Sequence, residues 1–425
     1  MAEEHVRSYY AASANPARAR APLQGEISCD VCVIGAGFTG LTIALELAEK
    51  GFDVVVLESV RAGWGASGRN GGQICSGYSA DMDRIAGWVG AVDARRLWSI
   101  AEEGKAIIED RVARHGIACD LTSGYLYAAD SPKHEAWLEP MVRDWAENYG
   151  YERARLIGRG ELRDLVRSDR FLGGVLDEGG GHLHPLNYAL GLADAAEAAG
   201  VRIFENSPVT EIDTGAAPWA RTAEGAVRAK FLAIAANAYL GGVAPELRRH
   251  IMPVGTYIVA TEPLGEEGAA EVLPTNLAVA DLNFVISYFR LSADRRMLFG
   301  TGVSYSTVPP LNTAERYRRK MVSLFPQLAD ARIEYIWGGF VGISRERTPH
   351  LGRLSPTVYF AQGFSGHGVA LTGIAGRVIA EAIAGQAERF DLFAKLPHTA
   401  FPGGRLLRTP LLVLAMTWIR LRELI

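Results

Sequence analysis

Apolar runs and helix-forming segments alternate at the start of the chain. Residues 29–34 (CDVCVI) form a nearly continuous apolar run, which is typical of a strand buried on both faces. Residues 41–50 are rich in helix-forming side chains, and Gly51 follows them as a stop signal. A second apolar run occupies residues 53–57. This order predicts a βαβ unit.

The same pattern returns later, between segments of a different texture. Residues 186–199 predict a helix, residues 201–204 a strand, and residues 357–385 a strand, a glycine loop and a long helix. Residues 86–182 and 244–335 contain charged amphipathic helices and β-like runs instead. No linker separates the two textures, so we expect an α/β fold (α+β overall) with two interleaved domains.

The expected boundaries follow from these textures. A Rossmann-type dinucleotide-binding domain would comprise residues 26–85, 183–243 and 336–400, and a second domain residues 86–182 and 244–335. The β-like runs of the second domain are residues 254–261, 284–291 and 297–301. Residues 1–25 would form an irregular N-terminal arm, and residues 401–425 a C-terminal tail.

Composition excludes several classes of protein. The chain has 425 residues with 44 Lys+Arg against 48 Asp+Glu, so no overall basic charge indicates nucleic-acid binding. The first 25 residues contain no uninterrupted apolar segment of the kind a secretory signal needs, so we expect a cytoplasmic protein. Residues 411–418 are apolar but too short to span a membrane, and Arg420 and Arg422 follow them. We expect an amphipathic tail that docks on the body of the protein, or that contacts a membrane surface or a partner.

Two short motifs have part of a metal-binding pattern. Cys29 and Cys32 have C-x-x-C spacing, but residues three apart on a strand point to opposite faces of the sheet. His182 and His184 would share one face of a strand, yet no third ligand is evident near them. A turn into the helix at residue 186, or a pocket wall, is the alternative role of these histidines. We expect no metal site.

Three glycines, Gly35, Gly37 and Gly40, form the pattern G-x-G-x-x-G between the first strand and the helix. In such a turn the first glycine permits the bend, the second lets backbone approach a pyrophosphate, and the third brings helix and strand together. The helix N-terminus then presents free N–H groups to the phosphates. Glu58 ends the second strand, where a carboxylate accepts hydrogen bonds from ribose hydroxyls. This arrangement predicts dinucleotide binding.

A second glycine cluster lies at residues 61–73 (RAGWGASGRNGGQ). Its five glycines allow the backbone to lie close to a flat ligand. Ser67, Arg69, Asn70 and Gln73 supply polar groups for a pyrophosphate or a ring edge. A merely flexible surface loop would not need the Arg-Asn pair, so we favour contact with the ligand.

A third cluster, residues 363–368 (GFSGHG), follows the strand predicted at residues 358–361. A helix from about Val369 to Ala384 comes next, and its N-terminus offers N–H groups and the positive end of its dipole. His367 would then hydrogen-bond the ligand or substrate, or cap and pack the helix.

The three clusters, in this order and at these distances, resemble those of the FAD-dependent amine and amino-acid oxidase family. That family includes D-amino-acid, glycine and sarcosine oxidases. Further segments are similar to the branch that oxidises γ-glutamylated putrescine: YYAASAN at 9–15, GWGASGRNGGQ at 63–73, GGHLHPLN at 180–187 and FPGGRLLRTP at 401–410. The resemblance covers essentially the whole chain.

The resemblance implies FAD bound noncovalently in an extended conformation, with the substrate enclosed by a mostly antiparallel sheet over the flavin. Hydride would leave the carbon next to the substrate nitrogen for the flavin, and oxygen would reoxidise the flavin to give hydrogen peroxide. The imine would hydrolyse to an aldehyde and ammonia. The helix dipole after residue 368 would stabilise negative charge on the reduced ring.

The residues expected to bind FAD follow from the motifs and the resemblance together. They are Gly35, Ala36, Gly37, Phe38, Thr39, Gly40, Glu58, Ser59, Arg61, Gly65, Ala66, Ser67, Arg69, Asn70, Gly71, Gly72, Gln73, Val209, Ala236, Asn237, Gly366, His367, Gly368, Val369 and Ala370.

One departure from the family pattern concerns the substrate. The sarcosine-oxidase branch has a carboxylate-binding lysine two residues after GFSGHG, and Ala370 stands there in this chain. A methyl group cannot bind a carboxylate next to the reacting carbon, so the substrate carries its anion further away or has none. Arg290, Arg345 and Arg347 are candidate anion-binding groups, although the two arginines that flank Glu346 could equally form a surface ion cluster with it.

The candidate catalytic residues are His367, Arg347, Arg290, Tyr257 and Trp337. The two aromatic residues would line a slot over the flavin, or simply belong to the core. The leading hypothesis is a flavoprotein oxidase of polyamine catabolism that acts on a small amine similar to γ-glutamylputrescine, with O2 as acceptor. Alternatives are a secondary-amine or amino-acid oxidase, a dehydrogenase with another acceptor, and a noncatalytic flavin-binding partner. The oligomeric state stays open.

Overall fold

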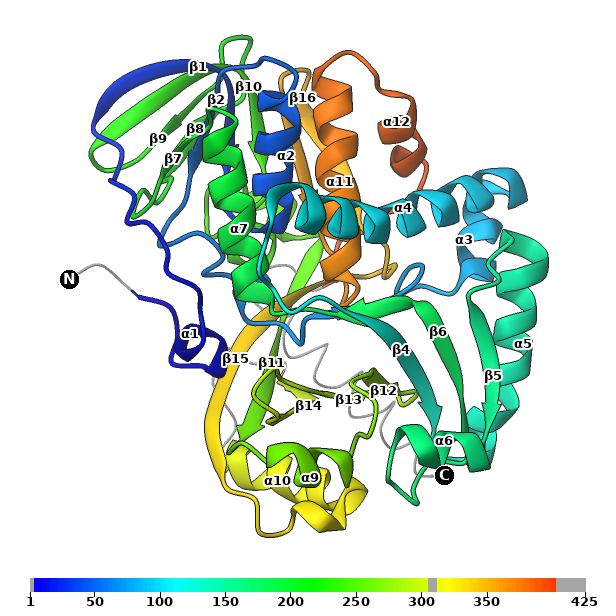
Figure 1. Ribbon diagram of the computed structural model, residues 1–425. Helices are drawn as coiled ribbons and strands as arrows, with labels where there is room; N and C mark the ends of the chain where they lie inside the picture. Colours follow the sequence, from blue (N-terminus) through cyan, green and yellow to red (C-terminus); the bar gives the residue numbers. More distant parts are fainter. Residues whose placement is uncertain (1–3, 305–311, 403–425) are drawn as a thin grey trace.

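Two β-sheets with helices packed around them make up the structure. It is a computed structural model that describes residues 4–304 and 312–402 (Figure 1). The first sheet occupies the upper half of Figure 1 and the second sheet the lower half. The tail expected at residues 401–425, with its apolar stretch at 411–418, lies outside the described residues from 403 onward.

The first sheet is largely parallel and has strands in the order β16-β17-β10-β1-β2-β7. Strands β1, β2, β7, β10 and β17 run parallel, and β16 is antiparallel to β17. β8 and β9 form a side branch on β10. The bounds are β1 (Gly25–Ile34), β2 (Val54–Leu57), β7 (Arg202–Phe204), β8 (Glu211–Asp213), β9 (Trp219–Arg221), β10 (Gly225–Ile234), β16 (His350–Ser355) and β17 (Val358–Gln362).

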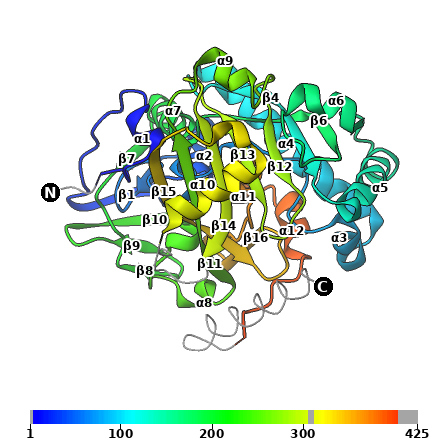
Figure 2. The same ribbon diagram turned by 90° about the horizontal axis from the view of Figure 1, so that it is seen from below.

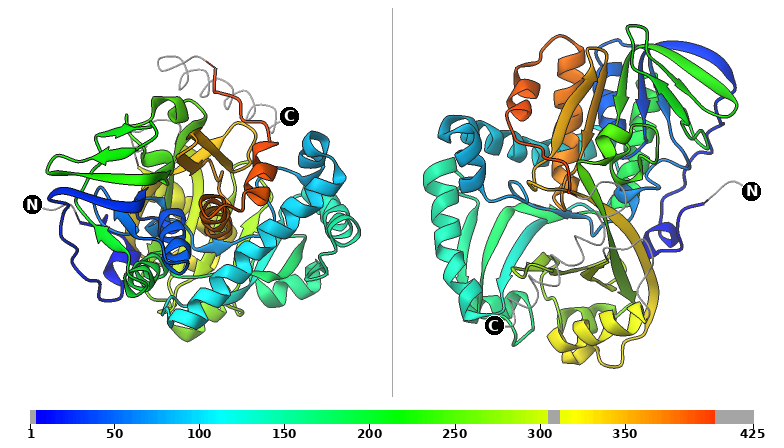
Figure 3. Two further views of the ribbon diagram at one scale, coloured as in Figure 1. Left: turned by 90° about the horizontal axis from the view of Figure 1, so that it is seen from above. Right: turned by 180° about the vertical axis from the view of Figure 1, so that it is seen from behind.

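Three helices lie side by side against one face of this sheet (Figures 1 and 3): α7 (Pro185–Ala198), α2 (Phe38–Ala48) and α11 (Gly368–Ile383). The long helix α4 (Ala91–His115) packs across them. Nearly every residue of α2 is buried, because helices cover it on both sides. The predicted strand–turn–helix–strand unit is therefore present as β1, α2 and β2.

The second sheet is antiparallel except where β12 runs parallel to β4. Its strand order is β15-β11-β14-β13-β12-β4-β6-β3, with β5 paired to β6. The bounds are β3 (Gln73–Ile74), β4 (Thr122–Ala129), β5 (Ala154–Gly158), β6 (Gly173–His182), β11 (Ile251–Thr261), β12 (Ala278–Asp281), β13 (Ser287–Leu291), β14 (Met297–Ser304) and β15 (Ile333–Ser344).

Further helices flank the second sheet and the connections. Helix α10 (Thr313–Leu324) lies across the sheet when the molecule is seen from below (Figure 2), and buries Tyr317, Met321 and Leu324 in the core. The remaining bounds are α1 (Tyr9–Ala12), α3 (Met82–Val89), α5 (Pro132–Tyr149), α6 (Arg159–Leu165), α8 (Pro245–Arg248), α9 (Gly265–Ala270), α12 (Glu388–Ala394), η1 (Ala66–Gly68), η2 (Asn237–Tyr239) and η3 (Pro326–Leu328).

The structure differs from the sequence analysis at several places. Strand β3 lies within the expected segment 26–85 of the dinucleotide-binding domain but pairs with β6 of the second sheet. Strand β15 crosses the expected boundary between residues 335 and 336, because it pairs along its whole length with β11 of the second sheet. The β-like run expected at 284–291 begins only at Ser287, and Phe284 and Ile286 are exposed. The arm expected to be irregular contains α1, whose Tyr9 and Tyr10 are buried.

Among the described residues no single helix is long and apolar enough to cross a membrane. The pair α11 and α12 passes such a test only together, and it is bent by 118°.

Candidate cofactor and active site

The first glycine turn joins β1 to α2. Gly35 has a φ of +107°, a conformation that favours glycine. A Cβ on Gly40 would lie 1.9 Å from the Gly35 carbonyl oxygen, so α2 sits directly against the turn. Gly37 begins the helix without a side-chain cap, and the N–H groups of the first turn have no partner carbonyl within the helix. The turn therefore presents the positive end of the helix dipole and the N–H groups of Thr39 and Gly40, whereas the Phe38 N–H is taken by a side chain of the neighbouring loop.

Glu58 closes this turn from the end of β2. Its carboxylate accepts hydrogen bonds from the Ala36 N–H at 2.7 Å, the Val60 N–H at 3.0 Å and the Ser59 hydroxyl at 2.9 Å. Burial raises the pKa of this carboxyl, although the hydrogen bonds oppose the rise. Glu58 thus fixes the shape of the turn as well as offering a carboxylate to a ligand.

The loop at residues 61–73 folds back over the start of α2. The Ser67 hydroxyl accepts a hydrogen bond from the Phe38 N–H at 2.9 Å. The Asn70 amide donates to two carbonyls of η1 at 3.0 Å each and accepts from the Gly72 N–H at 2.7 Å. These bonds hold the loop in one conformation beside the helix N-terminus.

A cavity of about 330 Å³ runs along the three glycine clusters. It is lined by the end of β2, the start of α2, the 61–73 loop, the residues after β10 and the start of α11. The expected FAD-binding residues in its lining are Gly35, Gly37, Phe38, Thr39, Glu58, Ser59, Gly65, Ala66, Ser67, Asn70, Val209, Ala236, Asn237, Gly366, Gly368 and Val369. The carboxyl ends of parallel strands meet at this edge, which explains why segments far apart in sequence converge there.

The other expected FAD-binding residues are described but do not line this cavity: Ala36, Gly40, Arg61, Arg69, Gly71, Gly72, Gln73, His367 and Ala370. Several hold the lining residues in place. Arg61 pairs with Glu4 at 2.7 Å, and the Arg69 guanidinium lies 4.0 Å from the centroid of the Trp64 ring. The Gln73 amide nitrogen donates to carbonyls of β12 and β13 at 3.2 and 3.3 Å, which joins the loop to the second sheet.

Four polar side chains of the lining were not selected from the sequence: Trp64, Tyr239, Ser365 and Thr372. Trp64 lies inside the glycine loop, and Tyr239 follows β10 two residues after Asn237. Thr372 is one helical turn beyond Gly368, whose carbonyl its hydroxyl contacts at 2.6 Å. The position of Tyr239 after a parallel strand was the signal that could have revealed it.

Arg290 has partners that leave it little freedom to bind a substrate anion. Its Nε donates to the Gly71 carbonyl at 2.7 Å, and one terminal nitrogen donates to the Leu183 carbonyl at 2.9 Å and the Tyr10 hydroxyl at 3.1 Å. The other terminal nitrogen donates to the Leu291 carbonyl at 3.1 Å. Arg290 therefore serves as an internal clamp rather than as the open anion-binding group expected from the sequence.

The two candidate aromatic residues are anchored differently. Trp337 is buried, and its indole N–H donates to the Arg69 carbonyl at 3.0 Å. Tyr257 is half-buried on β11, with its ring edge-on to Tyr317. Trp337 thus supports the 61–73 loop from the second sheet, whereas Tyr257 keeps a partly open ring.

His367 is the N-cap residue of α11, and Arg347 lies in the turn between β15 and β16. Burial, together with the nearby Arg347 charge, lowers the pKa of His367 to about 4. Arg347 is half-buried, and its guanidinium carbon lies 5.4 Å from the centroid of the exposed Phe284 ring. The surface ion cluster considered for Arg345, Glu346 and Arg347 is not present in that form at Glu346. The Glu346 carboxylate is buried, and it accepts hydrogen bonds from the N–H and the hydroxyl of Thr399.

The histidines His182 and His184 mark a turn rather than a metal site. His182 ends β6, and the His184 ring accepts a hydrogen bond from the Asn187 N–H at 3.1 Å as the cap of α7. Cys29 and Cys32 both lie on β1 with free thiols. Within residues 4–304 and 312–402 no group of three or more His, Cys, Asp or Glu side chains is placed to hold a metal ion.

The cavity lining fits FAD. The α2 N-terminus offers donors for a pyrophosphate, Glu58 offers a carboxylate for ribose hydroxyls, and the start of α11 offers a positive dipole end for the flavin. A dinucleotide-binding sheet of this kind, with its cavity at the carboxyl ends of the strands and a second sheet beside it, defines a flavin-dependent oxidoreductase.

Comparison with known proteins supports this class. Residues 30–382 match the model of the DAO family, described as FAD dependent oxidoreductase, and the chain belongs to that family. It is similar to gamma-glutamylputrescine oxidoreductase of Escherichia coli K12, with 47% identity over 421 residues that cover 99% of both chains. It is also similar to the probable oxidoreductase OrdL of Haemophilus influenzae, with 42% identity over 96% of this chain and 94% of the relative.

The fold has solved relatives as well. The crystal structure of glycine oxidase from Geobacillus kaustophilus superposes with a TM-score of 0.72, at 20% identity, over 88% of this chain and 100% of that chain. The family resemblance, the fold class, the dependence on FAD and the oxidoreductase activity expected from the sequence are therefore confirmed.

Proposed function

We propose that the protein oxidises the C–N bond of a small primary amine that carries a carboxylate far from the reacting carbon, as γ-glutamylputrescine does. The observation that carries this proposal is the 47% identity over almost the full chain to gamma-glutamylputrescine oxidoreductase. The overall reaction converts the amine, O2 and water to an aldehyde, ammonia and hydrogen peroxide. FAD held in the cavity supplies the hydride acceptor.

Ala370 and His367 support an amine without a carboxylate beside the reacting carbon. Ala370 is buried in the first turn of α11 and offers only a methyl group. His367, with a pKa of about 4, is uncharged at neutral pH. Its ring can therefore accept a hydrogen bond from the substrate amine, and the same desolvation that lowers the pKa of His367 also favours the neutral amine that hydride loss requires.

Arg347 is proposed to attract the remote carboxylate of the substrate. It is close enough to His367 for its charge to depress the pKa of that ring, and it lies beside the exposed Phe284 ring. A guanidinium can grip a carboxylate bidentately, so a cation at this position selects amines with an acidic far end.

An anaerobic flavin-reduction screen tests the proposal. The yellow protein is mixed with γ-glutamylputrescine, putrescine, sarcosine, glycine and 4-methylaminobutanoate, and the flavin absorption band is followed. Rapid bleaching by γ-glutamylputrescine, reversed by air with peroxide formed in equal amount to aldehyde, is expected. Bleaching only by a secondary amine, or without peroxide on aeration, would instead assign a secondary-amine oxidase or a dehydrogenase.

The role of Arg347 has a separate test. In Arg347→Met, the KM for γ-glutamylputrescine is expected to rise about tenfold while the KM for putrescine stays the same, because only the first substrate has a carboxylate. The exposed neighbour Arg345 provides the matched control Arg345→Met. Equal changes for both amines would contradict the assignment.

A cytoplasmic location and O2 as the natural acceptor stay predictions.

A further inference from the structure

Within the N-terminal arm, residues 4–20 contact the 61–73 loop and the side chains that support it. Glu4 pairs with Arg61 at 2.7 Å, and its carbonyl accepts a hydrogen bond from the Trp64 indole N–H at 3.1 Å. Trp64 belongs to the cavity lining. The arm therefore contacts a residue that lines the cofactor cavity.

The central contact of the arm is Tyr10, whose side chain is completely buried. Its ring is edge-on to Trp337 with centroids 5.1 Å apart, and to His184 with centroids 4.9 Å apart. Its hydroxyl accepts a hydrogen bond from Arg290 at 3.1 Å. These contacts show that this part of the arm packs as part of the core.

Two of these partners of Tyr10, Arg290 and Trp337, also hold the 61–73 loop. Arg290 donates to the Gly71 carbonyl, and Trp337 donates to the Arg69 carbonyl. These two carbonyls flank Asn70, which lines the cavity and fixes the loop through its own side chain. Tyr10 thus contacts the two side chains, Arg290 and Trp337, that hydrogen-bond the loop on either side of Asn70.

A second connection starts at Arg20, which is also buried. Its guanidinium pairs with Glu197 at 2.8 Å and with Glu205 at 3.3 Å. The Glu205 carboxylate accepts a hydrogen bond from the Ala62 N–H at 3.0 Å. The loop is therefore tied to the arm near its beginning, through Ala62, as well as near its end.

We propose that the N-terminal arm is a positioning element for the cofactor, and that Tyr10 and Arg290 are positioning residues that hold the 61–73 loop against bound FAD. The inference rests on the assignment of the cavity to FAD. It explains why Arg290 is buried in contacts with the arm and the loop instead of standing open to substrate. It predicts that a change in the arm loosens FAD while the two sheets stay folded.

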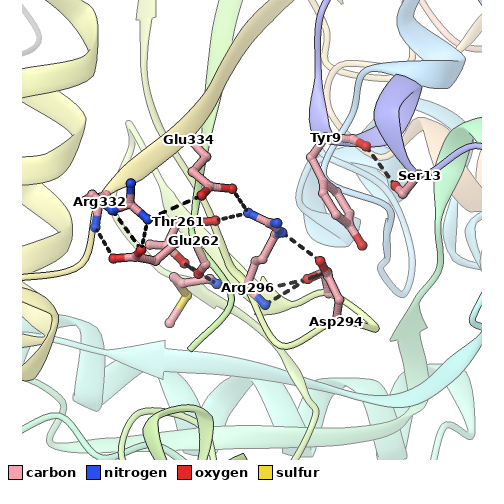
Figure 4. Close-up of polar contacts among 10 residues, drawn as sticks. Tyr9, Ser13, Thr261, Glu262, Asp294, Arg296, Arg332 and Glu334 are labelled. Atoms are coloured by element: carbon pink, nitrogen blue, oxygen red, sulfur yellow. Dashed lines mark hydrogen bonds and ion pairs between the residues drawn. The ribbon is translucent and has the colours of Figure 1, made fainter. Parts of the chain in front are cut away.

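Tyr9 offers a matched control on the same helix. Figure 4 shows its ring pointing toward Asp294 and Arg296. Arg296 pairs there with Asp294 at 2.7 Å and with Glu334 at 2.5 Å. Removing the Tyr9 hydroxyl therefore deletes the same chemical group from the arm without touching the contacts of Tyr10 and Arg290.

The experiment compares the full-length wild type with Tyr10→Phe, Tyr10→Ala and Tyr9→Phe. FAD release is followed by the rise of free-flavin fluorescence on dilution, and the visible flavin spectrum of each holoprotein is recorded. Circular dichroism and the Tm of the FAD-free proteins report folding. Tyr10→Phe is expected to raise the dissociation constant for FAD about tenfold and to shift the flavin band, with Tyr10→Ala larger and Tyr9→Phe unchanged.

Two results would overturn the inference. One is an FAD dissociation constant and spectrum for Tyr10→Phe that match those of Tyr9→Phe. The other is a loss of FAD that appears only in step with a fall in the Tm of the FAD-free protein, because that would show general unfolding rather than positioning. A wild type that binds no FAD would instead refute the cofactor assignment, and the substrate screen has no bearing on either outcome.

Discussion

A substitution at Gly40 tests whether the contact between α2 and the first glycine turn is as tight as the structure shows. A Cβ at Gly40 would lie 1.9 Å from the Gly35 carbonyl oxygen, 3.1 Å from the Gly35 carbonyl carbon and 3.2 Å from a methyl group of Val33. Two of these atoms are backbone and cannot rotate aside. In Gly40→Ala the helix must therefore move away from the turn by about 1 Å.

The cost follows from overpacking in a buried site. Forcing an extra methyl group into packed structure costs about 1–3 kcal/mol, and the better helix propensity of alanine returns about 1 kcal/mol of it at most. The displaced turn also carries the first-turn N–H groups that face the cavity. We expect Gly40→Ala to lower the free energy of unfolding of the FAD-free protein and to weaken FAD binding as well.

Gly87 provides the matched control. It lies in helix α3, and a Cβ there would meet nothing within 4 Å. Gly87→Ala is expected to raise the free energy of unfolding by about 0.5–1 kcal/mol, because alanine loses less conformational entropy in a helix. Urea unfolding followed by circular dichroism and FAD titration by fluorescence measure both variants. If Gly40→Ala unfolded and bound FAD like Gly87→Ala, the argument from the close contact would be refuted.

Three further predictions use other parts of the structure. Glu58→Gln is expected to weaken FAD binding by about 1–3 kcal/mol in an FAD titration, because the amide replaces one of the oxygens that accept backbone and hydroxyl hydrogen bonds; an unchanged affinity would contradict this role. Ser67→Ala is expected to lower the free energy of unfolding by about 1 kcal/mol, since it removes the acceptor of the Phe38 N–H; equal urea midpoints would disprove it. Burial lowers the pKa of His350 to about 2 and that of His398 to about 4, so the unfolded chain binds more protons and stability falls as the pH drops below about 6.5. His398→Gln should flatten that fall between pH 7.5 and pH 5 in urea titrations, and an unaltered pH profile would show that His398 contributes nothing.

Much of the first sheet was predictable because its signals are local. The apolar run at 29–34, the glycines of the turn and the apolar run at 53–57 are consecutive in the chain, and each residue acts on its near neighbours. The third glycine cluster was equally visible, since a strand, a loop and a helix succeed one another there. The residues after β10 carried a weaker signal, and Tyr239 was missed although the neighbouring Asn237 was selected.

The roles of individual side chains were harder to predict, because they depend on contacts between distant segments. Arg290 was expected to bind an anion, yet its partners are Gly71, Leu183, Leu291 and Tyr10. A guanidinium donates wherever carbonyl oxygens surround it, and the sequence does not show which carbonyls those are. The arm seemed irregular for the same reason, since a four-residue helix is held by what it packs against rather than by its own propensity.

The sequence by itself determined the class of this protein. The glycine turn, the acidic residue at the end of the second strand and the later glycine clusters constrain the backbone locally, and a backbone of that shape binds a dinucleotide. Only the tertiary structure decided which polar groups face the cavity and which hold it in place. Glu58 and Ser67 line the cavity and also hold its shape, Glu58 through the Ala36 N–H and Ser67 through the Phe38 N–H. Arg290 does not line the cavity and supports the loop through the Gly71 carbonyl. The physical reason is that a side chain's chemistry is a property of the residue, whereas its burial and its partners are fixed by segments that meet only when the two sheets have formed.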